Sequence, residues 1–93
     1  MSVEDKLTNV AVLRILTSFW VDITQVSVRT TGGVVYLGGT IQRMTASHRD
    51  LGEGVLRELD TRLRKLPTVR DVKYHFVNWE RKLTGYWLPR DPN

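Results

Sequence analysis

The most regular hydrophobic pattern lies in residues 26–41, where apolar residues recur at alternate positions on both sides of Gly32 and Gly33. A period of two is typical of a β-strand with one buried face. Paired glycines adopt the positive φ angles that a tight hairpin turn requires. We therefore expect a β-hairpin with its turn at Gly32–Gly33. The core-facing positions that follow are Val35, Leu37, Gly39 and Ile41.

A helical pattern precedes the hairpin. Ser2 and Asp5 have the spacing of a capping box, which predicts a helix that runs to about Ser18. The stripe expected to face the core consists of Ala11, Val12, Ile15, Leu16 and Phe19. Further apolar residues lie off this stripe: Leu7, Val10, Leu13 and Trp20. A loop or the C-terminal tail is the simplest cover for them, and a partner surface is the alternative.

A second helix is expected over residues 47–66, where Ser47 and Asp50 form another capping box. A proline directly after this range ends the helix, because it disfavours helical geometry at the residue before it. Gly52 falls on the apolar arc of the helix. We expect Gly52 to lie against Gly39, since two positions without side chains let a helix approach a sheet closely.

The last strand is expected over residues 69–79, and residues 80–93 show no period of their own. The element order helix–strand–strand–helix–strand predicts an α+β fold. It is a two-layer sandwich with two helices on one face of a three-stranded mixed sheet. Residues 1–79 are expected to form the sandwich domain, and residues 80–93 a basic, aromatic tail or irregular cover.

Composition narrows the class of protein further. The 93 residues include no cysteine, which removes disulfides and thiolate metal sites. A hydrophobic share of 41% suits a globular domain, and no apolar run is long enough to span a bilayer. The acidic start MSVEDKL lacks the basic and then apolar pattern of a signal peptide. This predicts a cytoplasmic protein, or a periplasmic one if a leader was removed.

The element order and the hairpin residues resemble the BON domain, a small bacterial module of osmotic-stress, nodulation and haemolysin-like proteins. The hairpin pattern of that family is G-x-V-x-L-x-G-x-V. Its positions are occupied here by Gly33, Val35, Leu37, Gly39 and Ile41. The resemblance covers about residues 5–78 and implies a binding module for phospholipid or another protein, and not an enzyme. Because the matching residues are expected in the core, their role is structural.

The sequence contains no residue set typical of catalysis, and we expect no enzymatic activity, cofactor or metal site. His48 and His75 have no Asp or Glu at ligand spacing. Ser47 and His48 are neighbours in sequence, which does not indicate a nucleophile–base pair. The glycine pairs lack the spacing and the Lys-Ser/Thr of a phosphate-binding loop.

The functional prediction rests on the C-terminal segment. The net charge of the chain is +4, and residues 61–93 carry eight Lys or Arg against three Asp or Glu. The residues predicted to bind are Trp79, Arg81, Lys82, Tyr86, Trp87 and Arg90. Basic residues beside aromatic ones suit an anionic phospholipid surface or a protein partner, and structural cover is the simpler interpretation. Single-stranded nucleic acid and homo-oligomers formed through an exposed sheet edge are further alternatives.

Overall fold

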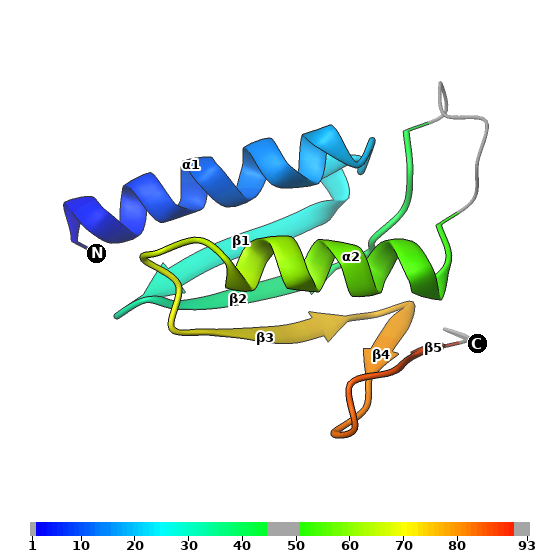
Figure 1. The fold of residues 1–93 in the computed structure, drawn as a ribbon. Coiled ribbons are helices and arrows are strands. Elements are labelled where there is room, and N and C mark those ends of the chain that lie inside the picture. The colour runs from blue at the N-terminus through cyan, green and yellow to red at the C-terminus, as the bar shows by residue number, and fades with distance from the viewer. Residues whose placement is uncertain (1, 45–50, 91–93) are drawn as a thin grey trace.

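The computed structural model describes residues 2–44 and 51–90, and Figure 1 shows its elements along the chain. The elements are α1 Val3–Ser18, the 3₁₀ turn η1 Ile23–Gln25, β1 Val26–Thr31, β2 Val34–Gly39, α2 Glu53–Arg64, β3 Asp71–Phe76, β4 Trp79–Arg81 and β5 Trp87–Pro89. Strands β1, β2 and β3 form one sheet in that order, and β4 and β5 form a separate antiparallel pair.

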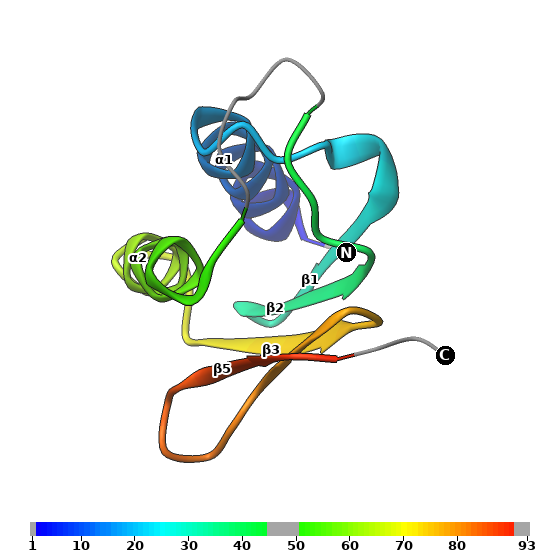
Figure 2. The same ribbon diagram turned by 90° about the vertical axis from the view of Figure 1, so that its right-hand side faces the viewer.

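Both helices lie on one face of the three-stranded sheet, as Figure 2 shows. Strand β2 is central: it pairs antiparallel with β1 and parallel with β3. A parallel pair needs a crossover connection, and α2 lies in the crossover between β2 and β3. The predicted α+β fold, with two helices on one face of a mixed three-stranded sheet, is confirmed.

Helix α1 begins and ends where the sequence predicts. The Ser2 hydroxyl accepts a hydrogen bond from the backbone N–H of Asp5 at 3.0 Å, which satisfies a donor of the first helical turn. The helix ends at Ser18, and its predicted stripe faces inward, with Val12 and Leu16 fully buried. Burial of this stripe contributes more to the stability of the helix than intrinsic helix propensity does.

The predicted hairpin turn is present. Gly32 and Gly33 have φ angles of 58° and 82°, and Thr31 pairs with Val34 across the turn. The alternate positions that follow are buried in the core: Val35, Leu37 and Ile41. The period of two therefore identified both the strand and its buried face.

Gly39 and Gly52 do not face each other, so that prediction is wrong. Gly39 has a φ of 85°, and a Cβ atom there would lie 2.3 Å from the carbonyl oxygen of Gln25. Gly52 is the N-cap of α2, and nothing lies within 4 Å of the place where its Cβ would be. Glycine at position 39 thus serves the backbone conformation and the contact with the segment that leads into β1.

Helix α2 is shorter than the predicted range of residues 47–66: it begins at Glu53, with Gly52 as its N-cap, and ends at Arg64. The capping box predicted at Ser47 and Asp50 lies outside the described residues. The apolar arc of the helix does face the core, and its buried members are Leu56, Leu59 and Leu63.

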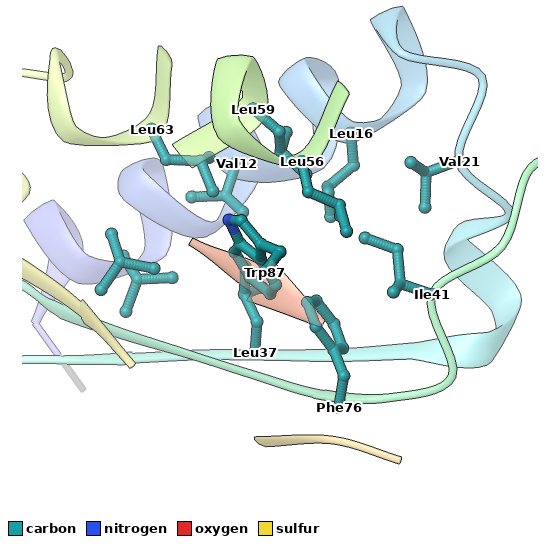
Figure 3. Close-up of a cluster of buried hydrophobic side chains, with 12 residues drawn as sticks. Val12, Leu16, Val21, Leu37, Ile41, Leu56, Leu59, Leu63, Phe76 and Trp87 are labelled. Carbon is teal, nitrogen blue, oxygen red and sulfur yellow. The ribbon is translucent and has the colours of Figure 1, made fainter. Parts of the chain in front are cut away.

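The C-terminal segment is a β-hairpin and not an irregular tail. Strand β3 ends at Phe76, three residues before the predicted end, and β4 and β5 follow at the β3 side of the molecule (Figure 2). Trp87 of β5 is 1% exposed and lies between α2 and the sheet (Figure 3). Its ring fills the core beside Phe76, with 6.3 Å between the ring centroids. The predicted boundary after residue 79 therefore cuts through one packed unit.

Candidate functional site

The structure divides the aromatic residues of the predicted site between core and surface. Trp87 is buried, and Trp79 is partly buried against the core. Tyr86 remains 42% exposed. Trp87 therefore has no surface to offer a ligand, and the binding role predicted for it is wrong. Sequence reasoning missed this because aromatic residues near a chain end suit a binding surface and a core equally well.

The basic residues of the same segment already have carboxylate partners. Arg81 Nη2 lies 3.6 Å from Oδ2 of Asp60, which is buried. Lys82 Nζ and Arg90 Nη2 each lie 3.3 Å from an oxygen of Glu80. Hydrogen bonds from Arg90 and Lys82 hold the pKa of Glu80 below its usual range. These pairs reduce the positive charge that the β4–β5 hairpin presents to an anionic partner.

Asp60 also joins the hairpin to α2 and β3. Its Oδ1 accepts hydrogen bonds from Tyr74 Oη at 2.5 Å and from Arg64 Nε at 2.9 Å. Burial raises the pKa of Tyr74, and the hydrogen bond to Asp60 raises it further, so the phenol stays protonated and donates. The ring of Tyr74 meets Trp87 edge-on, with centroids 4.6 Å apart. This network fixes the hairpin on the domain beside α2 and β3. Trp20, which the C-terminal tail was expected to cover, stays 55% exposed.

A different surface is open to a partner: the side of α1 that points away from the sheet. Leu7 is 64% exposed there, and Val3 and Val10 are exposed beside it. These residues lie on the opposite side of the helix from the buried Val12 and Leu16. The sequence pattern had marked Leu7 and Val10 as lying off the core stripe. The structure covers neither of them with its described residues.

Exposed cations lie on the same side of α1. Lys6 and Arg14 are exposed, and among the described residues neither forms an ion pair with a carboxylate. Arg14 also lines a shallow depression with Val10 and Thr17, whose volume is about 290 Å³. The outward surface of α1 therefore combines apolar side chains with unpaired positive charge.

The end of α1 carries a strained residue. Trp20 has a φ of 62°, a conformation that costs a residue with a Cβ about 1–2 kcal/mol. The Val21 N–H donates to the Leu16 carbonyl at 3.1 Å, so the chain leaves the helix through the cap that usually has glycine at this position. The indole is nevertheless 55% exposed, so burial does not offset the strain fully. Strain of this kind is concentrated at functional sites.

Two further exposed apolar residues lie near Trp20 in the structure or in the sequence. The N–H of Met44 donates to the Trp20 carbonyl at 2.8 Å, and the side chain of Met44 is exposed. Ile23, three residues after Trp20, is exposed as well. We refer to the exposed apolar residues of α1, together with those near Trp20, as the α1 surface: Val3, Leu7, Val10, Trp20, Ile23 and Met44.

Two further properties of the described chain bear on function. Within residues 2–44 and 51–90, no helix has the length and apolar character needed to cross a bilayer. In the same residues, no three His, Asp or Glu side chains are grouped so that they could hold a metal ion.

The fold is a two-layer α+β sandwich with an added C-terminal hairpin. In comparisons with known proteins, no protein-family model, curated protein or solved structure matched the chain. The resemblance of the hairpin to the BON domain accordingly stays a prediction.

Proposed function

We propose that this protein is a non-catalytic binding module that docks on an anionic phospholipid surface through the α1 surface. The observation that carries the proposal is Trp20, whose exposed indole is held in a strained backbone conformation just after the helix that exposes Leu7 and Val10. The resemblance to the BON domain, which implies attachment to phospholipid or protein, supports the same proposal. The binding residues then belong to the α1 surface, and not to the C-terminal hairpin predicted from the sequence.

The chemistry of the α1 surface fits the boundary between lipid headgroups and acyl chains. A helix that lies in the plane of a membrane places its apolar side chains about 5–10 Å deep into this boundary. The amphipathic ring of a tryptophan such as Trp20 is favoured at headgroup level. Lys6 and Arg14 point to the same side, and each basic residue near an anionic membrane contributes about 1 kcal/mol.

The neighbouring helix adds positive charge to this side of the molecule. Helix α2 lies beside α1 on the same face of the sheet (Figure 2). Its Arg62 places Cζ 5.6 Å from the ring centroid of Phe19, so the guanidinium lies near the C-terminal end of α1. Lys65 is exposed one turn further along. Arg62 therefore adds a cation beside the C-terminal end of α1, where positive charge favours approach to an anionic lipid surface.

Cosedimentation with vesicles tests the proposal. The wild-type protein is expected to bind vesicles rich in phosphatidylglycerol and to bind neutral phosphatidylcholine vesicles much more weakly. The double substitution Leu7→Ser and Val10→Ser should reduce binding roughly tenfold or more, because it removes two apolar anchors. Leu83→Ser is the matched control, since Leu83 is a fully exposed leucine in the β4–β5 turn. No binding to anionic vesicles at low salt would reject the proposal.

A further variant separates the α1 surface from the C-terminal hairpin. Lys82→Ser with Arg90→Ser removes the hairpin cations, which are paired with Glu80 on the surface. We expect this variant to bind vesicles within about twofold of the wild type, because exposed pairs of this kind are already largely neutralised. Loss of binding in this variant alone would place the lipid site on the hairpin and contradict the proposal.

A protein partner is the second candidate, favoured by the same exposed apolar residues. If the α1 surface binds a second copy of the chain, light scattering will show a dimer that Leu7→Ser with Val10→Ser dissociates. Vesicle binding would then be absent or unaffected by that variant. The two measurements together therefore distinguish attachment to lipid from self-association.

A further inference from the structure

The face of the sheet opposite the helices carries an ordered set of polar and aromatic side chains. Arg29, Tyr36 and Lys73 are register partners on β1, β2 and β3, so they form one row across this outer face. Ser27, Gly38 and His75 form the next row. In the second row the central position has no side chain, while Ser27 and His75 on either side of it are exposed.

On this face a guanidinium lies over one aromatic ring, and that ring is stacked with a second ring. Arg29 Cζ lies 5.0 Å from the centroid of the Tyr36 ring. Tyr36 and His75 lie nearly parallel, with 10° between their planes and 6.4 Å between their centroids. A guanidinium stacked on a ring keeps its N–H donors at its edge, where they can meet a phosphate in a bidentate manner. Arg29 is thereby oriented before any ligand binds.

The missing side chain of Gly38 leaves a shallow depression of about 420 Å³. Its lining includes Ser27, Arg29, Tyr36 and His75. A Cβ atom at Gly38 would lie 2.9 Å from Oγ of Ser27, so a larger residue would fill this space. The depression therefore brings together two aromatic rings, a hydroxyl and a cation around a position without a side chain.

We propose that this outer face binds single-stranded nucleic acid. One base lies over Gly38 against His75 and Tyr36, and the Ser27 hydroxyl is placed to bond its edge. Arg29 and Lys73 contact the adjacent phosphates on either side of Tyr36. Stacking on aromatic side chains together with cations along the backbone is the usual means of binding a single strand.

The geometry favours a strand over other ligands. The depression is open, so a free nucleotide would be held on few sides, while a strand adds contacts along the row of Arg29, Tyr36 and Lys73. Lys73 Nζ lies 3.7 Å from an oxygen of Asp71, and both side chains are about half exposed. Such a surface pair is weak and can be exchanged for a phosphate. A duplex groove is entered by a protruding helix or β-ribbon, and the described residues of this sheet face present neither.

Fluorescence anisotropy with a labelled single strand of about twelve nucleotides tests the inference. Arg29→Gln and the double substitution Tyr36→Thr with His75→Thr should each weaken binding roughly tenfold or more. Threonine is accepted in strands, so the fold should persist, and circular dichroism and a thermal melt check this. Arg57→Gln is the matched control: it removes the same charge from an exposed position on α2, where Arg57 pairs with Glu53.

Salt dependence gives an independent readout. With two phosphate contacts, the plot of log binding constant against log salt should have a slope of about −1.4, and Arg29→Gln should reduce its magnitude by about 0.7. Absence of binding at low salt would overturn the inference. So would equal weakening by Arg57→Gln, or binding of a free mononucleotide as tight as that of the strand. The double substitution Leu7→Ser with Val10→Ser, which should weaken vesicle binding, should retain full oligonucleotide binding. The reason is that α1 lies on the opposite face of the sheet (Figure 2).

Discussion

Oδ1 of Asp5 accepts a hydrogen bond from the backbone N–H of Gly33 at 3.2 Å, which joins the first turn of α1 to the tip of the β1–β2 hairpin. The other carboxylate oxygen accepts from the N–H of Gly32 at 3.1 Å. Burial acts to raise the pKa of Asp5, but the hydrogen bonds from Gly32, Gly33 and Ser2 together outweigh it and lower the pKa. One carboxylate thus satisfies both donors of the turn and helps to fix the helix on the sheet.

This contact predicts a loss of stability in acid. Because the pKa of Asp5 is lower in the folded protein than its ordinary value of 3.8, the unfolded chain binds more protons in the window between the two values. The contribution of Asp5 is therefore fully present at neutral pH. It declines as the pH falls below about 5 and is lost as the pH passes through the folded pKa. Urea unfolding at a series of pH values measures this decline.

Asp5→Asn isolates the effect of this carboxylate from that of other acids. Asp22, Asp71 and Glu80 also have lowered pKa values, and they are unchanged in the variant. We expect Asp5→Asn to be less stable than the wild type at neutral pH and to lose less stability on acidification. Parallel stability–pH curves for the two proteins would show that Asp5 does not stabilise the turn in its ionised form.

Trp20→Gly should separate stability from binding. Glycine adopts the φ of 62° without steric cost, so the variant should be more stable by about 1 kcal/mol, which raises Tm by about 4–8 °C. The same variant should bind anionic vesicles more weakly, because the exposed indole is gone. A thermal melt and the vesicle assay measure the two effects. A variant that is less stable than the wild type would mean that the indole packs on the fold and that its conformation is not strained.

Glycines 39 and 54 should respond to alanine in opposite directions. Gly39→Ala forces a Cβ to within 2.3 Å of the Gln25 carbonyl oxygen at a φ of 85°, so we expect a loss of about 2 kcal/mol or more. Gly54 lies in α2 with open space around it, and Gly54→Ala should add up to about 1 kcal/mol. Denaturant unfolding measures both effects: if the m-value is the same for all variants, a shift of the midpoint reports the change in stability. Similar destabilisation by both substitutions would contradict the distinct roles given to these glycines.

Trp87→Ala should destabilise the whole domain and not only the hairpin. Removing a fully buried tryptophan typically costs about 3–5 kcal/mol, a large part of the total stability of a small domain. Tyr86→Ala is the adjacent control, because Tyr86 is exposed and its removal should change stability by about 0.5 kcal/mol or less. Far-ultraviolet circular dichroism, which does not rely on tryptophan fluorescence, follows the unfolding of both variants. If truncation after residue 79 left Tm unchanged, the hairpin would be an appendage after all.

Local patterns determined most of the elements. The glycine pair with its alternating neighbours placed the β1–β2 hairpin and its buried face, since turn geometry and a period of two are both local properties. The capping box and the apolar stripe placed α1, including its last residue, Ser18. Their order then limited the chain to a helix layer on one face of a mixed sheet. Residues 80–93, by contrast, show no period of their own, so the sequence did not predict the two short strands, whose stability depends on the core beneath them.

The sequence by itself thus determined the fold class, the turn and the inward faces of α1 and β2, because each is encoded by neighbours within a few residues. Only the tertiary structure decided which remaining side chains are covered. It placed Trp87 in the core and gave Lys82 and Arg90 an acidic partner, while Trp20 and the Arg29–Tyr36–His75 set stayed on the surface. Whether an aromatic or basic residue is exposed depends on segments far away in the chain, and no local pattern records where those segments pack.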